Sequence, residues 1–300
     1  FLGAKIPEHP KAAGILPFYN NSYEPEFLVQ TGLGSTENVT KTISYGGERK
    51  THWNIGEDLQ KCSEGGLNKP LLQPEDKLYV FVSYISRAFE LEVHKASSFE
   101  AVPTYEYRVD QEEFNTNGNK HVGMRYENEE GLDYFPAWNP CPVDRPFNPS
   151  NTSCASIDCS QGEHLCNECC TGKHFNGTVF TPPGFYQMKT LPGRMYDAPI
   201  PIFASPPHML WAPNQVSSSL VGQSPNEEMH QPIEWIVNPT LGAAVHAHAR
   251  VQFSLPIWKG ALTQSSSLPN SIAPLGWLHL EVQMHEDMMT LVKLGGLYVP

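Results

Sequence analysis

The sequence predicts a mainly β fold with a minor helical component, an α+β protein, on three observations. Proline and glycine number 27 and 23 of the 300 residues, and only 17% of residues are charged, a mixture typical of chains rich in strands and loops. Between Val245 and Phe253 apolar and polar residues alternate strictly, which is the period-two pattern of a half-buried strand. The prolines within Pro199–Pro206 exclude a helix interior, because each removes a backbone donor and fixes φ.

Shorter strands are expected before this segment. The pattern predicts a strand over Phe27–Gln30, and two more over Lys77–Val82 and Phe89–Val93 with a turn near Ser83–Arg87. The stretch Asp110–Pro140 is polar and rich in Asn and Glu, which predicts a solvated excursion with weak strands.

The carboxyl-terminal part is expected to alternate strand and turn through Ile272–Leu280 and then to form a short amphipathic helix over Met284–Leu294. Glycine at Gly295 predicts the end of that helix. The apolar residues that set the helical spacing are Met284, Met288, Leu291 and Val292.

The charge of these residues excludes nucleic acid as a partner, and their hydropathy excludes a membrane-spanning segment among them. The net charge is −12 and no basic patch is present, whereas binding nucleic-acid phosphates needs clustered Lys and Arg. No run of 18 apolar residues occurs, so no segment has the composition of a membrane span, and the first residues lack signal-peptide architecture.

Cysteine usage predicts an oxidising, extracellular or lumenal compartment. Six of the seven cysteines fall within a short segment, and four glycosylation sequons accompany them. The cluster could instead hold zinc through thiolates, but the nearby sequons favour disulfides, and seven thiols leave at least one without an intramolecular partner. The cysteines are Cys62, Cys141, Cys154, Cys159, Cys166, Cys169 and Cys170, and the predicted glycosylation sites are Asn20, Asn38, Asn151 and Asn176.

A series of motifs between Ser205 and Gly242 carries a family resemblance. The order is Ser-x-Pro-His-x-x-x-Ala from Ser205, then Pro-Asn-x-Glu-x-His from Pro225, then Pro-x-x-Gly from Pro239, followed by the long strand. This order resembles the class B scavenger receptors. The spacing from His230 to Pro239 is one residue longer than in that family, which predicts a bulge or a longer turn.

The resemblance implies an antiparallel β-barrel core that encloses an apolar tunnel for lipids, with short peripheral helices. It also implies that residues 1–300 are one domain, the carboxyl-terminal portion of a larger ectodomain, with a Cys-rich disulfide loop at residues 141–170. A missing amino-terminal segment or partner chain and two membrane anchors would lie outside this chain. In the family, a cysteine at the position of Cys62 bonds into the Cys-rich segment, while Ile85 and Phe180 stand where a second disulfide would be.

The expected function is a receptor ectodomain, at the cell surface or on the lysosomal or endosomal membrane, that binds and passes lipids such as fatty acids, sterols and lipoprotein lipids. The alternative is an adhesion or architectural membrane glycoprotein that keeps the fold without transport. One face of the long strand is expected to line the tunnel. The alternation separates the two faces of the strand but does not determine which face points inward. These residues are Val245, Ala247, Ala249, Val251 and Phe253, or their polar neighbours if the barrel is reversed.

No catalytic residue, metal or cofactor is expected. His246 and His248 could form half of a metal site, but alternating polar residues more often face water. His208 and His230, inside the family motifs, are expected to be structural histidines held by hydrogen bonds. Adjacent carboxylates at Glu227 and Glu228 are expected to point apart, and neither a Gly-x-Ser-x-Gly nor a His-Glu-x-x-His motif is present.

Overall fold

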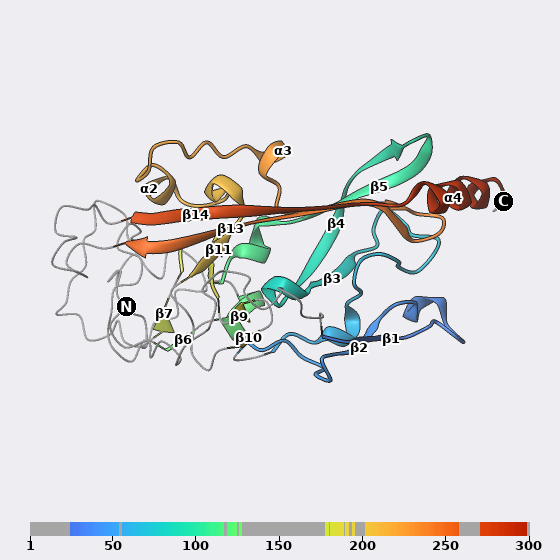
Figure 1. The fold of residues 1–300 in the computed structure, drawn as a ribbon, viewed down its shortest axis with the longest axis horizontal. Helices are drawn as coiled ribbons and strands as arrows, with labels where there is room; N and C mark the ends of the chain where they lie inside the picture. Colours follow the sequence, from blue (N-terminus) through green and yellow to red (C-terminus); the bar gives the residue numbers. More distant parts are fainter. Residues whose placement is uncertain are drawn as a thin grey trace, which may run out of the picture.

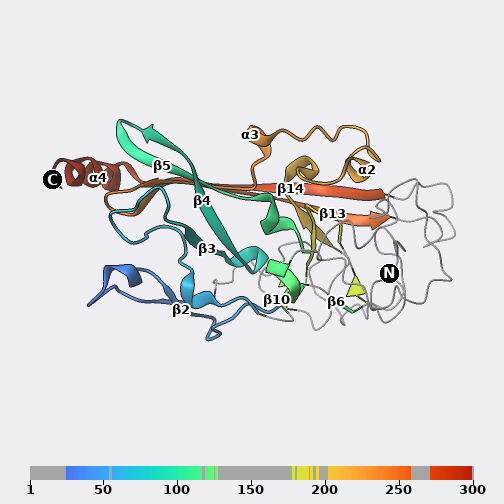
Figure 2. The same ribbon diagram turned by 180° about the vertical axis from the view of Figure 1, so that it is seen from behind.

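The longest dimension of the molecule follows two long antiparallel strands, β13 (Ala243–Ile257) and β14 (Ser271–Gln283), as Figures 1 and 2 show from opposite sides. Helix α4 (Glu286–Tyr298) lies at one end of this pair. Helices α2 (Asn214–Ser217) and α3 (Glu227–His230) lie on one side of it, and β1 and β2 lie on the other. The computed structural model describes residues 25–53, 56–116, 119–124, 126–127, 178–179, 181–188, 190–191, 194–195, 202–257 and 271–298.

The other strands are short except β4 and β5. They are β1 (Phe27–Val29), β2 (Thr42–Tyr45), β3 (Leu78–Val82), β4 (Arg87–Phe99), β5 (Val102–Val109), β6 (Tyr126–Glu127), β7 (Thr178–Val179), β8 (Tyr186–Gln187), β9 (Thr190–Leu191), β10 (Arg194–Met195), β11 (Phe203–Ser205) and β12 (Ile233–Asn238). Short 3-10 helices occur at Thr36–Asn38, Leu59–Lys61, Ser83–Ile85, Gln111–Phe114, Asn119–Met124 and Pro207–Met209.

The main sheet has eight strands in the order β3-β4-β5-β12-β13-β11-β8, with β14 on the other edge of β13. All of its strand pairs are antiparallel. The mainly antiparallel β fold with few short helices is therefore confirmed. Among the described residues β14 pairs with no strand except β13, so the sheet is open there and shows neither a closed barrel nor a tunnel.

The core lies on one face of this sheet. Ala249, Val251 and Phe253 of β13 pack there with residues of β3, β4, β5 and β12 in one apolar cluster. Val245, on the same strand, instead packs against Met289 and Val292 of α4. A long strand with the usual right-handed twist turns its side chains progressively, so its two ends serve two apolar clusters.

Several predicted elements are confirmed. Strands β3 and β4 flank a turn at Ser83–Ile85, although β4 continues six residues past the predicted end at Val93, to Phe99. The register of β12 against β13 shifts between Ile236 and Val237, but the residue without a partner there is Val245 of β13, so this bulge does not lie in the His230–Pro239 segment where one was predicted.

The carboxyl-terminal predictions need two corrections. Residues 271–283 form one continuous strand, not an alternation of strand and turn. Helix α4 runs through Gly295 to Tyr298, because a glycine weakens a helix by only about 1 kcal/mol and need not end it. Its buried apolar residues are Met289 and Val292, while the predicted Met288 and Leu291 are exposed. In the part of the chain that the structure describes, no helix is both long enough and apolar enough to cross a bilayer.

Candidate functional site

An open, mostly apolar pocket of about 470 Å³ lies between β3 and the β13–β14 pair. Its walls include Val80 and Val82 of β3, Ala247 and Ala249 of β13, and Leu280 and Val282 of β14. Pockets of roughly 300–1,000 Å³ hold small organic ligands in proteins. This pocket is therefore large enough for a hydrocarbon chain.

The register of the three neighbouring strands builds this wall. Ala247 pairs with Trp235 on one side and Val282 on the other, and Ala249 pairs with Leu280. Directly paired residues share a face of the sheet, so the two small alanines lie among larger apolar side chains and leave space above the strand. Leu280 and Val282 are 45% and 67% exposed, although both are apolar.

Trp235 is fixed at the pocket by a glycine. Its Nε1 donates a hydrogen bond of 3.0 Å to the carbonyl oxygen of Gly65. Gly65 has a φ of +92°, and a Cβ there would lie 2.5 Å from Nε1 of the indole ring. A side chain at this position would therefore displace Trp235 from the pocket wall.

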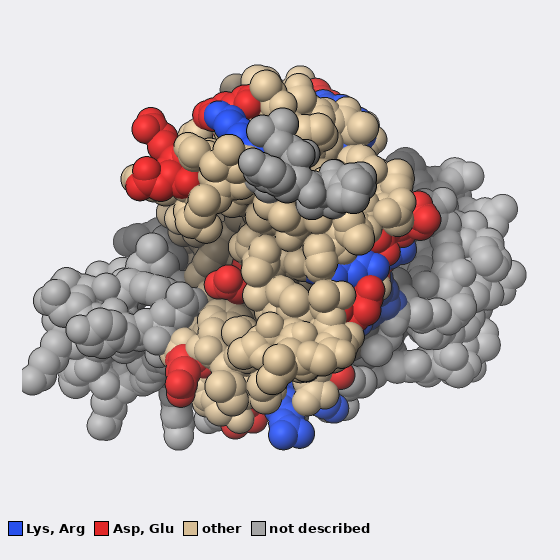
Figure 3. Space-filling view, turned by 90° about the vertical axis from the view of Figure 1, so that its right-hand side faces the viewer, with Lys and Arg blue, Asp and Glu red and all other residues tan. Residues whose placement is uncertain are grey.

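The end of the molecule where α4 lies is mainly uncharged. Figure 3 looks onto this end and shows acidic and basic side chains mostly toward its margins. Exposed apolar residues of α4 contribute to it, namely Met288, Leu291 and Leu294. The chemistry that this pocket and its surroundings offer is burial of apolar groups.

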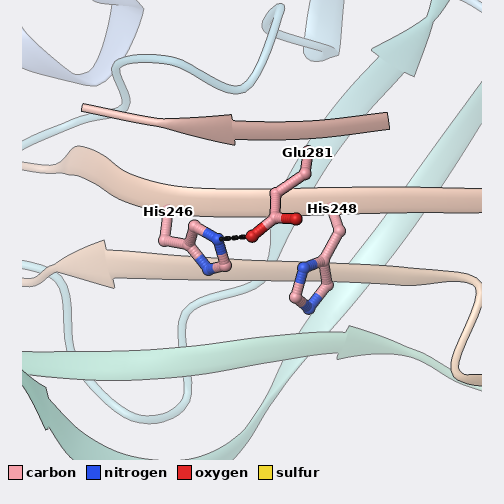
Figure 4. A group of neighbouring side chains, drawn as sticks. All are labelled: His246, His248 and Glu281. Atoms are coloured by element: carbon pink, nitrogen blue, oxygen red, sulfur yellow. Dashed lines mark hydrogen bonds and ion pairs between the residues drawn. The ribbon is translucent and has the colours of Figure 1, made fainter. Parts of the chain in front are cut away.

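The opposite face of β13 carries histidines and carboxylates. His246 Nε2 lies 2.8 Å from Glu281 Oε1, and His248 Nε2 lies 2.7 Å from Glu234 Oε1. Figure 4 shows the Glu281 carboxylate between the two imidazole rings. Arg108 donates from Nε to Glu234 Oε2 at 2.8 Å, which ties β5 to β12. The sequence predicted a polar face, with His246 and His248 as a possible half of a metal site, but alternation alone does not reveal the cross-strand carboxylates.

Charged residues form two separate clusters in the described part of the chain, one around Arg108 and one around Arg87. The Arg108 cluster consists of Arg108, Glu106, Glu228, Glu234 and His248, and its ion pairs are 2.7 to 3.0 Å long. Burial alone would raise the pKa of Glu234, but the hydrogen bond from His248 and the positive charges of His248 and Arg108 hold that pKa at about 2.

The Arg87 cluster consists of Arg87, Glu57, Glu113 and His121. The Arg87 side chain is fully buried, with its guanidinium 4.8 Å from the ring centres of Phe89 and Tyr186. Its nitrogens lie 3.6 and 3.7 Å from oxygens of Glu57 and Glu113. Burial raises the pKa of both carboxyl groups, and it lowers the pKa of His121 to about 2, with a further contribution from the charge of Arg87.

The family-motif histidines are held by hydrogen bonds, as predicted. The rings of His208 and His230 stack with 4.2 Å between their centres. Nδ1 of each accepts a backbone hydrogen bond, from Ser224 at 3.3 Å and from Asn226 at 2.9 Å. The Asn226 side chain in turn accepts from the Met229 amide and caps α3.

The carboxylates that follow Asn226 have separate partners, as predicted. Glu227 accepts a hydrogen bond of 3.4 Å from the Trp211 indole, and Glu228 forms an ion pair with Arg108. The two side chains therefore do not form an acid–base pair.

Of the predicted disulfide and glycan residues, the structure describes Cys62 and Asn38. Cys62 is fully buried, and burial, followed by the charge of Glu57, raises the pKa of its thiol to about 12. Asn38 is half-buried at the end of a 3-10 turn. Ile85 is buried in the core, as an apolar replacement for a cysteine would be. The remaining predicted residues lie outside the described residues, namely Asn20, Cys141, Asn151, Cys154, Cys159, Cys166, Cys169, Cys170, Asn176 and Phe180.

Sequence reasoning reached part of the pocket wall. Ala247 and Ala249 line it, while Val251 and Phe253 are packed in the core and Val245 contacts α4. It missed Leu280 and Val282, which alternate with His279, Glu281 and Gln283. That period-two run was the available signal.

Known proteins are similar to this sequence over nearly its full length. A family model described as "CD36 family" matches residues 2–300. A Caenorhabditis elegans protein named "Uncharacterized protein R07B1.3" is 30% identical over 302 residues, which cover 98% of this chain and 52% of the nematode protein.

More distant relatives come from insects. Sensory neuron membrane protein 1 of Bombyx mori is 22% identical over 94% of this chain and 43% of its own length. Sensory neuron membrane protein 2 of Aedes aegypti is 21% identical over 91% of this chain and 44% of its own length. The chain spans about half the length of the curated relatives it matches.

Proposed function

The chain belongs to the CD36 family, and on that premise we propose that it is the lipid-binding part of a membrane receptor that performs no chemistry on its ligand. The observation that carries the proposal is the pocket between β3, β13 and β14, whose lining is mostly apolar. The ligands are lipids with hydrocarbon chains, such as fatty acids, sterols or lipids from lipoproteins. The receptor faces the extracellular space or the lumen of a lysosome or endosome.

Burial of methylene groups provides the binding free energy. Each methylene removed from water contributes about 0.8 kcal/mol, so micromolar binding, about 8 kcal/mol, needs about ten buried methylenes beyond those that offset the cost of association. A partly exposed wall of Leu280 and Val282 offers such a surface before any ligand arrives. The pocket is the described portion of the route by which lipid would pass along the receptor.

The free edge of β14 supports a second part of the proposal. Among the described residues its backbone pairs with β13 alone, and an unpaired edge with exposed apolar side chains promotes aggregation. We propose that an amino-terminal segment or a partner chain pairs with this edge and closes the barrel around the lipid route. Amide hydrogen exchange of β14 in the full-length protein should then be as slow as that of β13, and fast exchange would contradict it.

The compartment proposal includes the modifications predicted from the sequence. Cys62 would bond to one cysteine of residues 141–170, and Asn20, Asn38, Asn151 and Asn176 would carry glycans. A non-reduced peptide map with and without glycosidase tests both, and an unmodified Cys62 thiol with unmodified asparagines would overturn the assignment.

The function is tested by filling the pocket. Ala247→Trp and Ala249→Trp place a large side chain in the space above β13, so we expect binding of a fluorescent fatty acid to weaken at least about tenfold, or 1.4 kcal/mol. Ala96→Trp is the matched control, because Ala96 is exposed on β4 away from the pocket. Lipids that copurify with the full-length protein are identified by mass spectrometry.

A second variant guards against misfolding of the tryptophan variants. Val282→Asp puts a charge on an exposed position of the pocket wall, where folding should be little affected, and it should also weaken binding. Wild-type protein without bound lipid, or equal fatty-acid binding by all four variants, would contradict the proposal and favour an adhesion or architectural role.

A further inference from the structure

Three potential metal ligands meet on the polar face of the β13–β14 pair, and two of them, His246 and His248, also border the apolar pocket. His246 and His248 are two residues apart on β13, and Glu281 lies directly across from His248 in the register with β14. One ligand atom from each of the three residues lies within 4.8 Å of the others. We propose that His246, His248 and Glu281 bind a divalent transition-metal ion, with Zn²⁺ as the ion that suits them best.

Strand geometry makes this arrangement stable before a metal arrives. Residues two apart on a strand project to the same side about 6.6 Å apart, and a residue on the adjacent strand can reach between them. Glu281 does so, because its carboxylate lies between the two rings in Figure 4 and only 2.8 Å from His246 Nε2. Phe99 stacks on the His246 ring at a centre distance of 5.6 Å and holds its plane.

The hydrogen bond between His248 and Glu234 determines which ring nitrogen of His248 is left for a metal ion. His248 uses Nε2 toward Glu234, at 2.7 Å. Its other nitrogen, Nδ1, is a buried atom with no hydrogen-bond partner among the described residues. In Figure 4 one nitrogen of this ring is turned toward the Glu281 carboxylate. A buried acceptor without a partner is costly, and a metal ion at this point would satisfy it.

Glu234 would act as a positioning residue for this ligand. Metal-binding histidines usually donate their second ring N–H to a carboxylate, which fixes the tautomer and the ring orientation. Glu234 is itself held by Arg108 at 2.8 Å, so its oxygen faces His248 as an acceptor. His248, one of the two histidines that the sequence suggested as half of a metal site, therefore has Glu234 as its hydrogen-bond partner and Glu281 as a neighbouring potential ligand.

The donor set selects the metal class. Two imidazoles and one carboxylate are the ligands that zinc takes in three-ligand sites, which leave one position for water or another ligand. Tetrahedral ligand atoms are about 3.3 Å apart, so the side chains need to move by about an ångström or two. Glu281 is half exposed, which allows both that movement and entry of the ion from solvent.

One positive group on the same face limits the affinity without filling the site. Arg250 is the next residue on this side of β13, and its Nη1 donates to the Gln231 carbonyl at 2.9 Å. The His279 imidazole lies beside His248, with 5.7 Å between ring centres, and burial lowers its pKa, which favours the neutral ring. Two carboxylates, Glu281 and Glu234, oppose the charge of Arg250 near the proposed ion position.

The test is a titration of the full-length protein with Zn²⁺ at pH 7.4, followed by calorimetry. We expect one ion per chain, and we expect Glu281→Gln and His246→Ala to weaken binding by at least about tenfold. Glu281→Gln is the decisive variant, because the residue is exposed and the substitution keeps the shape of the side chain. His285→Ala is the control, since His285 is an exposed histidine paired with Asp287 outside the site.

A second readout separates metal coordination from structure. Co²⁺ bound by this donor set should give visible absorption bands that Zn²⁺ abolishes, and Glu234→Gln should change these bands and weaken binding about 10- to 100-fold through the orientation of His248. The proposal is overturned if wild-type protein binds no stoichiometric Zn²⁺, or if Glu281→Gln and His246→Ala bind it as wild type and His285→Ala do.

Discussion

The Arg87 and Arg108 clusters contain the same kinds of side chain in different surroundings. Each combines an arginine, glutamates and one histidine. Around Arg108 the charged atoms are 2.7 to 3.0 Å apart and the pKa of Glu234 falls to about 2. Around Arg87 the atoms are 3.6 and 3.7 Å apart, and the pKa values of Glu57 and Glu113 rise.

The two clusters differ in whether removal from water or ion pairing determines the pKa of the carboxyl groups. The Arg108 cluster lies on a partly hydrated face of the sheet, so short hydrogen bonds stabilise the ionised carboxylate. The Arg87 cluster is enclosed by Phe89 and Tyr186, and removal from water outweighs its ion pairs, which include a close one between Lys120 and Glu113. The first cluster can therefore serve binding, whereas the second mainly determines stability.

The largest expected effect is on the Arg87 cluster. Arg87→Met removes the buried cation and leaves Glu57 and Glu113 with weaker compensation, so we expect a loss of about 3–5 kcal/mol in the free energy of unfolding. Arg108→Met is the matched control, and a smaller loss is expected because one partner of Arg108, Glu228, is 67% exposed to solvent. Urea unfolding measures both, and equal losses would remove the distinction between the clusters.

The next effect is a pH dependence that originates in His121. Its pKa is about 2 in the folded protein, while an unfolded histidine has a pKa near 6.5. Below pH 6.5 the unfolded chain therefore binds a proton that the folded chain does not, and stability falls by about 1 kcal/mol per pH unit from this residue. The raised pKa values of Glu57 and Glu113 act in the opposite direction.

The comparison of wild type with His121→Gln isolates that contribution. Unfolding free energies at pH 7.5, 6.5 and 5.5 should fall more steeply in the wild type than in the variant below pH 6.5. Parallel curves would show that His121 is protonated without cost.

The last effect belongs to Glu234; it is similar in size to that of His121 and has a different pH range. Its lowered pKa stabilises the folded state above the unfolded value near 4.3, and this contribution is lost as the pH falls toward 2. We expect Glu234→Gln to cost about 1–2 kcal/mol at pH 7, and the difference from wild type to shrink below pH 4. A difference that stays constant down to pH 3 would mean that the charge of Glu234 does not stabilise the fold.

Prediction from the sequence succeeded where the signal is local. The alternation over Val245–Phe253 identified β13 and separated its faces, whereas the extra residue before Pro239 did not locate the bulge, which lies at Val245 of β13. The family resemblance identified the stacked His208 and His230 as structural.

The rest depends on contacts between distant residues. The pocket joins Val80 and Val82 to β13 and β14, and the Arg87 cluster joins Glu57, Glu113 and His121. No periodicity links such positions. Likewise, His248 faces Glu234 and Glu281 only because of the register of β13 with its two neighbours, which the pattern of one strand cannot supply.

The alternation of His246, Ala247, His248 and Ala249 places two unlike surfaces on four consecutive residues. Whether a residue occupies an odd or an even position along the strand decides which surface its side chain joins, because a shift of one residue exchanges the faces of a strand. Losing one residue from the turn before Ala243 would thus bring histidines to the apolar pocket and alanines to the carboxylates. Losing two would restore the sidedness. Over evolution, length changes in this turn are therefore expected in even steps, unless a bulge such as the one at Val245 absorbs the odd residue.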